Sequence, residues 1–265
     1  MSAFRKIAYA YRLCAKVFSY FSFGVCSLLF SSVGFPILYV ASGFSQKRFQ
    51  RLARKIVHRY FKIFLWEMRL MGVLAWRTEN LSQFKIFPGV VVANHPSFLD
   101  VVILLAIIPN ANCIVKGSLA KTPFVRSFVK ALYIPNDMPF EKELELAAQS
   151  IREGSPLIIF PEGTRTVPDK PMRFKKGAAR FALYAQSDIL PIYIGGNEKI
   201  GLRKNDPFFS AHPTERYRYR IKALRPIPIR KFAGFSPSAA VIHITEELQE
   251  TLENERDRER GETAA

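Results

Sequence analysis

The first 45 residues contain the longest apolar stretch of the chain, and lysines and arginines crowd both of its ends. No charged residue occurs from 17 to 45, and a straight helix of that length would be longer than the roughly 30 Å hydrocarbon core of a bilayer. Gly34 and Pro36 both disfavour the interior of a helix. We therefore predict two helical pieces, 17–33 and 37–44, that form a broken hairpin in one leaflet, with a single membrane span as the alternative.

Residues 47–72 repeat apolar positions at the spacing of an α-helix, and their other positions are rich in lysine and arginine. The apolar positions are Phe49, Leu52, Ile56, Tyr60, Phe64, Met68 and Met71. This pattern predicts a basic amphipathic helix. It suits a helix that lies in the lipid headgroup region, and it equally suits one that packs its apolar side on a folded domain. Both interpretations hold if the helix lies between the bilayer and the folded domain.

From Trp76 onward, short apolar runs alternate with segments of helical periodicity. The candidate strands are 73–77, 90–94, 112–115, 156–160, 190–194 and 216–224, and the candidate helices are 97–108, 121–131, 139–152 and 175–186. A final helix is expected to begin at Ser236 and Pro237 and to run to about Glu255, after which the tail frays into solvent.

This alternation predicts an α/β fold, with a mixed, mostly parallel sheet flanked by helices and an N-terminal membrane-associated helical segment. We divide the chain into a membrane-associated helical region, 1–72, and an α/β domain, 73–265. The chain is long enough to bury one sizeable core.

The chain carries a formal net charge of +17, and the position of the charges distinguishes between the partners that such a charge can bind. No aspartate or glutamate precedes Glu67, so much of the excess positive charge lies beside the apolar segment. That arrangement favours membrane lipids as partners and speaks against nucleic acid, which calls for basic residues interleaved with aromatic ones across a domain. Cys14, Cys26 and Cys113 lack the spacing of a metal site and are expected to be free thiols.

Residues 94–100, Asn-His-Pro-Ser-Phe-Leu-Asp, lie between two apolar runs that predict a buried strand and the body of a helix. Pro96 suits the first turn of that helix, which places His95 at the strand-to-helix corner. Side chains lean toward the N-terminus of a helix, so Asp100 can reach one ring nitrogen of His95 and leave the other free to accept a proton. Such a pair is the usual arrangement of a general base, although a histidine that merely caps a helix would show the same spacing.

A second stretch, 160–165 (Phe-Pro-Glu-Gly-Thr-Arg), also follows directly on an apolar run, 157–159. Together the two stretches resemble the signature blocks of the glycerophospholipid acyltransferase superfamily, whose type member is 1-acylglycerol-3-phosphate acyltransferase. The first block, Asn-His-x-x-x-x-Asp, and the third, Phe-Pro-Glu-Gly-Thr-Arg, match residue for residue. The resemblance runs from about Gly89 to Gly195 and includes an apolar fourth block around Pro191.

The middle block departs from the family pattern. It should end in an aromatic residue, isoleucine, any residue and arginine, and here 133–136 reads Tyr-Ile-Pro-Asn. Asn136 thus replaces the arginine that is expected to hold the phosphate of the acceptor, and an amide offers no charge for that purpose. The resemblance implies that His95 and Asp100 are catalytic. Our candidates for substrate binding are Asn94, Lys116, Asn136, Glu162, Gly163, Thr164, Arg165 and Lys175.

Within the third block, Pro161 ends the strand and Gly163 permits a tight turn. That turn presents Glu162 and Arg165 at the carboxyl end of the strand, where ligands bind in open α/β sheets. The resemblance implies that Glu162 positions the acceptor, and Arg165 is the best remaining ligand for its phosphate or headgroup. The basic run that contains Lys175 suits either a solvated surface or a dock for donor phosphates.

These observations predict a membrane-bound O-acyltransferase that needs no cofactor and no metal. The donor is a fatty acyl thioester, either acyl-CoA or acyl carrier protein (acyl-ACP). The acceptor is a hydroxyl of a lysophospholipid-like molecule or, because of Asn136, of another lipid anchor. We expect the protein at the cell inner membrane with its catalytic domain on the cytoplasmic side, since positive charge flanks both ends of the apolar segment. Two rival hypotheses are a metal-dependent hydrolase that uses His95, Asp100 and Glu162, and a non-catalytic membrane-surface binding protein.

Overall fold

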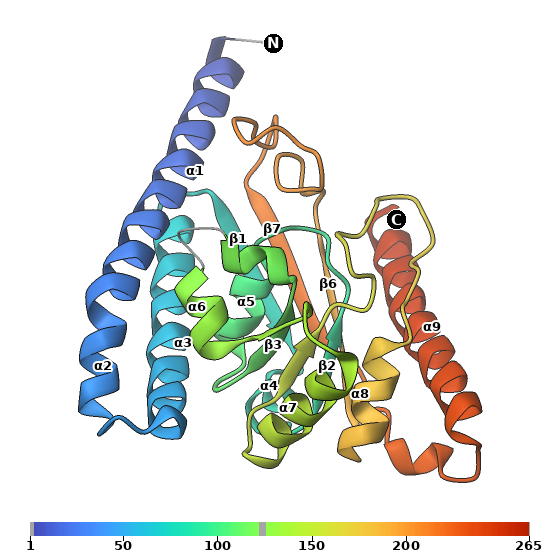
Figure 1. Cartoon of the computed structure of the whole chain (residues 1–265). Coiled ribbons are helices and arrows are strands. Elements are labelled where there is room, and N and C mark those ends of the chain that lie inside the picture. Colours follow the sequence, from blue (N-terminus) through green and yellow to red (C-terminus); the bar gives the residue numbers. More distant parts are fainter. Residues whose placement is uncertain (1–2, 122–125, 265) are drawn as a thin grey trace.

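The structure, a computed structural model, describes residues 3–121 and 126–264 (Figure 1). Residues 122–125, within the helix predicted at 121–131, lie outside the described residues. In the part of the chain that is described, a seven-stranded sheet has helices packed on both faces, and the N-terminal helices lie along one side of the molecule. The predicted α/β fold is confirmed.

The N-terminal apolar segment forms one long helical run. α1 (Ala3–Leu29) continues through a π-helical turn (Phe30–Gly34) into α2 (Phe35–Ala41). By length and composition, the helical run Phe4–Ala41 is able to cross a membrane: its most apolar window has a mean hydropathy of 1.8, and only 11% of that window is buried in the protein.

The predicted division of this segment into 17–33 and 37–44 was therefore wrong. Pro36 lies in the first turn of α2, directly after the π turn. In a π turn each N–H reaches back five residues, so the wider turn relieves the clash that a proline ring causes inside a regular helix. The chain reverses later, where Gly43 and Phe44 have φ values of 65° and 58°.

α3 (Gln46–Leu70) runs back alongside α1 and confirms the helix predicted at 47–72. Its buried side consists of Phe49, Ala53, Arg54, Val57, Phe61, Phe64, Leu65 and Met68. That side packs against the helix that follows β2, so the N-terminal helices and the α/β domain share one hydrophobic core. Other apolar side chains of α3, such as Ile63 and Leu70, remain exposed.

The sheet is mixed and mostly parallel, as predicted. Its strands are β1 (Leu74–Glu79), β2 (Val90–Ala93), β3 (Asn112–Val115), β4 (Ile134–Pro135), β5 (Leu157–Ile159), β6 (Ile189–Gly196) and β7 (Tyr217–Ala223). They are arranged in the order β1-β7-β6-β2-β5-β3-β4, and every neighbouring pair is parallel except β6 with β7. Each candidate strand corresponds to one of these, whereas the two-residue β4 was not predicted.

The remaining helices cover the two faces of the sheet. They are α4 (Leu81–Ile86), α5 (Asp100–Ile107), α6 (Arg126–Leu132), α7 (Phe140–Arg152), α8 (Gly177–Ala185) and α9 (Pro237–Ala264). Side chains of β2 alternate between the faces. Val91 and Ala93 join the core under α3 and α5, while Val90 and Val92 join the core under α7, α8 and α9.

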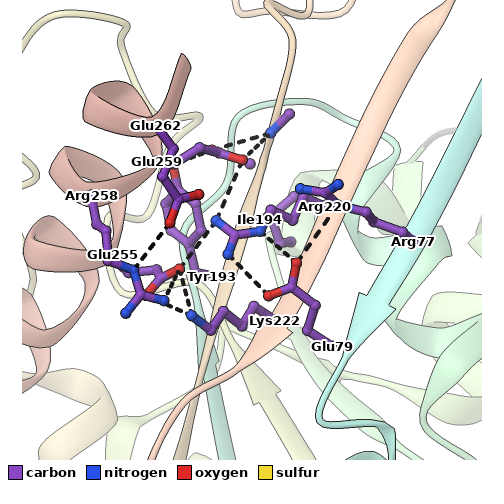
Figure 2. Close-up of polar contacts among 12 residues, drawn as sticks. Arg77, Glu79, Tyr193, Ile194, Arg220, Lys222, Glu255, Arg258, Glu259 and Glu262 are labelled. Carbon is purple, nitrogen blue, oxygen red and sulfur yellow. Dashed lines mark hydrogen bonds and ion pairs between the residues drawn. The ribbon is translucent and has the colours of Figure 1, made fainter. Parts of the chain in front are cut away.

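α9 begins where predicted but does not fray. The expectation that the helix ends near Glu255 was wrong, because it continues to Ala264 and Glu255 is only 6% exposed. Figure 2 shows the cause: Glu255 and Glu259 on α9 meet Arg220 and Lys222 on β7. These charges lie on segments far apart in the sequence, so the composition of the tail alone did not reveal them.

Candidate active site

The corner after β2 places His95 and Asp100 side by side. His95 Nδ1 lies 2.8 Å from Asp100 Oδ2, which is the contact predicted from the spacing. The Asp100 side chain is fully buried, and that of His95 is 17% exposed. Because a carboxylate only accepts hydrogen bonds, Nδ1 of the neutral imidazole carries the proton and Nε2 keeps its lone pair. That tautomer is the one that a general base requires.

Asn94 fastens this corner to the neighbouring strand. Its Nδ2 donates to the carbonyl of Ile194 at 2.9 Å, and its Oδ1 accepts from the Ile194 N–H at 2.7 Å. Asn94 is 3% exposed. Substrate binding was expected of it, but both polar groups of the amide are engaged with β6. In this structure Asn94 therefore holds the carboxyl end of β2 beside β6.

The third block folds over the same corner, because β2 and β5 are parallel neighbours and their carboxyl ends meet at one edge of the sheet. The Thr166 N–H donates to the His95 carbonyl at 2.8 Å. In return, the His95 N–H donates to Thr166 Oγ1 at 2.9 Å and to Glu162 Oε1 at 3.3 Å. The Phe160 ring stacks on the imidazole with the ring centroids 4.3 Å apart. The two blocks thus form a single site.

The turn of the third block is tight and buries a carboxyl group. Gly163 has a φ of 66°, and a side chain there would come within 2.8 Å of Lys175 Nζ. Glycine therefore lets Lys175 pass close over the turn. Burial raises the pKa of Glu162, although hydrogen bonds from the Thr166 hydroxyl and the His95 backbone lower it in part. That Glu162 positions the acceptor stays a prediction.

The remaining candidates follow β3, β4 and β5, which are parallel neighbours, so they lie at the same edge of the sheet. Asn136 Oδ1 accepts from the Gly117 N–H at 3.1 Å, so Asn136 lies beside the segment that contains Lys116. The side chains of Lys116, Asn136 and Thr164 are exposed. Their role in substrate binding stays a prediction.

Comparison with known proteins agrees with the motifs. A family model described as Acyltransferase matches residues 75–195. A 1-acyl-sn-glycerol-3-phosphate acyltransferase of Helicobacter pylori is 27% identical over 235 residues, which cover 84% of this chain and 88% of that protein. A protein of Mycoplasma pneumoniae, named "Probable 1-acyl-sn-glycerol-3-phosphate acyltransferase", is 28% identical over 214 residues, with 74% and 78% coverage. The chain belongs to the glycerophospholipid acyltransferase superfamily.

The fold of this O-acyltransferase also has a counterpart among solved structures. The crystal structure of the 1-acyl-sn-glycerophosphate acyltransferase PlsC from Thermotoga maritima superposes with a TM-score of 0.66 at 19% sequence identity. The match covers 92% of this chain and 96% of that one. Membership of the superfamily favours catalysis over the hydrolase and binding-protein hypotheses.

An apolar cavity of about 360 Å³ lies beside the corner that holds His95 in this acyltransferase. It is enclosed by side chains of α1, α3, α5 and α6, among them Phe23, Phe64, Val102, Leu105, Phe128 and Val129. His95 and Arg165 also line it. The cavity is thus mostly apolar, with the polar side chains of His95 and Arg165 in its wall.

Arg165 is held at the edge of this cavity by the loop between β6 and β7. Its Nη1 donates to the carbonyls of Arg203 at 2.7 Å and of Leu202 at 3.4 Å, and its guanidinium lies 5.7 Å from the centre of the Phe98 ring. A guanidinium has five N–H donors, so these contacts leave donors for an anionic group of a substrate.

Ser97, Thr166 and Tyr219 also make contacts in the site, although the sequence pattern did not point to them. Ser97 and Thr166 lie inside or beside the motif blocks, and their hydroxyl groups were the available signal. Tyr219 lies on β7, and only the strand order shows that β7 approaches the corner. Within the described residues, no group of three or more His, Cys, Asp and Glu side chains is arranged to hold a metal ion. The three cysteines are free thiols, as predicted.

Proposed function

We propose that this acyltransferase moves a fatty acyl group from a thioester donor, acyl-CoA or acyl-ACP, to a hydroxyl of a lysophospholipid-like acceptor. The observation that carries the proposal is the pairing of His95 with Asp100 where an apolar cavity and Arg165 meet. Relatives that are named 1-acyl-sn-glycerol-3-phosphate acyltransferases support an acceptor of this class.

His95 is the general base of the proposed reaction. Its Nε2 takes the proton of the acceptor hydroxyl while the hydroxyl oxygen attacks the carbonyl carbon of the thioester. A C–O bond forms, the C–S bond breaks, and the imidazolium returns the proton to the departing thiolate. Asp100 stabilises the imidazolium through Nδ1. The transfer is direct, without an acyl-enzyme, and requires no metal or cofactor because a thioester is already activated.

The apolar cavity suits the fatty acyl chain. Its wall is mostly hydrocarbon, and the imidazole of His95, the proposed base, forms part of that wall. Burial of each methylene group contributes about 0.8 kcal/mol, so an enclosed apolar cavity supplies both affinity and selection for chain length.

The acceptor headgroup is assigned to the polar side of the site. Arg165, with Lys116 and Lys175, offers positive charge for a phosphate or other anionic headgroup. Asn136 lacks the charge that the family pattern has at this position, so an acceptor other than lysophosphatidate, including a non-glycerophosphate lipid, is the second candidate.

Membrane association follows from the exposed side of the N-terminal helices. Apolar side chains that remain exposed on α1, α2 and α3 include Phe18, Phe21, Leu29, Ile37, Ile63 and Leu70. Basic residues flank this surface at both ends. These features support a location at the cell inner membrane with the catalytic domain on the cytoplasmic side.

One experiment tests the reaction and the membrane association together. The purified protein is mixed with anionic vesicles that carry a panel of lysolipid acceptors, and acyl-CoA or acyl-ACP is added. The vesicles are then floated, and their products are identified by mass. We expect the enzyme to float with the vesicles and to acylate at least one lysolipid. Enzyme that stays in the aqueous fraction would contradict the membrane assignment, and a lack of product with every pair would contradict the reaction.

Val102→Phe tests the assignment of the cavity. The larger side chain fills part of the cavity, so long acyl chains lose the burial of about two methylene groups. We expect this to lower kcat/KM for long donors roughly tenfold relative to kcat/KM for shorter donors. Competition between thioesters of increasing chain length measures this shift. Ile242→Phe, at an exposed position on α9, is the matched control. An unchanged chain-length profile in Val102→Phe would show that the acyl chain binds elsewhere.

A further inference from the structure

A buried chain of hydroxyl groups lies behind Asp100. Ser97 Oγ is 2.6 Å from Asp100 Oδ1, and the Tyr219 hydroxyl is 2.9 Å from Ser97 Oγ. Ser97 and Asp100 are fully buried, and Tyr219 is 2% exposed. Tyr219 belongs to β7, which lies outside residues 75–195 that match the family model. A strand beyond the family motifs thus reaches the catalytic pair.

The donor and acceptor roles in this chain follow from its chemistry. A carboxylate only accepts hydrogen bonds, so the single proton of the Ser97 hydroxyl points to Asp100 Oδ1. Ser97 Oγ then has only lone pairs to offer, and the Tyr219 hydroxyl donates to it. Burial raises the pKa of Tyr219 well above its usual value, which keeps this proton in place. The proton order is therefore Tyr219 to Ser97 to Asp100.

The other oxygen of Asp100 is held independently. Oδ2 accepts from the Ser97 N–H at 2.7 Å and lies 2.8 Å from His95 Nδ1. Rotation of the carboxylate about its Cβ–Cγ bond would break a charge-assisted hydrogen bond at each oxygen. The hydrogen bond from Tyr219 also favours one of the staggered rotamers of the Ser97 side chain over the others.

We propose that Tyr219 is a positioning residue of the catalytic site, which acts through Ser97 and Asp100 to hold His95 in the Nδ1–H tautomer. The proposal rests on the function proposed above for His95. Tyr219 does not touch the substrate. It fixes the orientation of the Asp100 carboxylate, so that Oδ2 accepts from His95 Nδ1–H and Nε2 stays available as the base.

Packing alone does not account for the hydroxyl of Tyr219. The ring fills the core, and Lys199 Nζ lies 4.5 Å from its centroid. Backbone carbonyls take up the protons of that ammonium group, among them those of Gly195 at 3.2 Å and Arg218 at 2.9 Å. A phenylalanine would fill the same space, so the contact with Ser97 is what the hydroxyl adds.

Tyr219→Phe tests the proposal, because it keeps the ring and removes the donor. We expect kcat to fall about tenfold, the effect of one buried hydrogen bond, while KM for donor and acceptor stays within about twofold. The matched control is Tyr217→Phe: Tyr217 is equally buried on β7, but its hydroxyl donates to the Ile200 carbonyl at 2.9 Å. An unchanged kcat in Tyr219→Phe, or an equal fall in Tyr217→Phe, would overturn the proposal.

A second set of variants tests the route through Ser97. If Tyr219 acts only through this hydroxyl, the double variant Ser97→Ala/Tyr219→Phe has the same kcat as Ser97→Ala. Ser97→Thr, which keeps a hydroxyl, restores most of the activity that Ser97→Ala loses. Additive losses in the double variant would show that Tyr219 acts elsewhere.

A measurement without substrate separates this inference from the proposed function. Nitrogen-15 NMR of His95 should show one dominant tautomer in the wild type and a measurable fraction of Nε2–H in Tyr219→Phe. An unchanged spectrum in the folded variant overturns the inference, whereas a wild type inactive with every substrate pair overturns only the proposed function. If Tyr219→Phe does not fold, a ring-fluorinated tyrosine at 219, which keeps the shape and alters donor strength, replaces it in both measurements.

Discussion

We expect His95→Ala to lower kcat by about 10²–10⁴-fold, the usual contribution of a general base, and to leave the protein folded. In the variant, the buried Asp100 carboxylate keeps its hydrogen bonds from the Ser97 N–H and the Ser97 hydroxyl, so it is not left without donors. We expect the loss in kcat more than in KM, because the proposed base acts on the hydroxyl proton in the transition state and not in substrate binding. Steady-state turnover with a productive pair of donor and acceptor measures the effect.

The control for this variant is His243→Ala. His243 is exposed on α9, and its replacement should leave turnover close to that of the wild type. Thermal unfolding of both variants verifies that the fold is kept. Turnover near the wild-type value in a folded His95→Ala protein would remove His95 from the mechanism, and would leave the pairing with Asp100 as a structural contact at a helix start.

The contact between His95 and Asp100 was predictable because its geometry is local. Only four residues lie between His95 and Asp100, and the turn from β2 into α5 brings the two side chains together. The sequence also placed Glu162 at the carboxyl end of its strand. Its approach to His95 depends in addition on the parallel pairing of β2 with β5, which the structure supplies. Periodicity likewise located most of the strands that carry these residues.

Features that depend on strand order or tertiary contacts were not predictable. Tyr219 reaches Ser97 only because β7 lies beside β6, and nothing in the local pattern of either strand specifies that order. Pro36 suggested a break, but the π turn before it allowed the helix to continue. The end of α9 was misjudged because the partners of Glu255 lie on β7.

Arg220 and Lys222 form a buried ionic network with Glu255, shown in Figure 2, that joins α9 to the sheet. Arg220 on β7 is 5% exposed and binds Glu79 through two nitrogens, Nε at 2.7 Å and Nη2 at 3.0 Å. Its Nη1 lies 3.2 Å from Glu255 Oε1. Lys222 lies 2.9 Å from the same oxygen of Glu255. Arg220 therefore neutralises carboxylates from β1 and from α9 at once.

Arg220→Met is expected to lower the free energy of unfolding by about 3 kcal/mol, because it removes the main counter-charge of Glu79 and one of the counter-charges of buried Glu255. Chemical denaturation at neutral pH measures this change. Arg77→Met is the matched control: Arg77 contacts the same Glu79 at 3.6 Å, but its side chain is 70% exposed, so the expected loss is at most about 1 kcal/mol. Equal losses in the two variants would show that the network stabilises the fold no more than a surface pair does.

The difference in unfolding free energy between the wild type and Arg220→Met should depend on pH in one direction. The hydrogen bonds from Arg220 hold the pKa of Glu79 below its usual value. A lowered pKa in the folded state stabilises the protein above the pKa of the unfolded state, and that contribution is lost as the pH falls through the folded-state pKa. The stability gap between the wild type and Arg220→Met should therefore be largest near neutral pH and should narrow in acid. Denaturation curves at several pH values test this, and a gap that widens in acid would contradict the assignment of Glu79 as the ionised partner of Arg220.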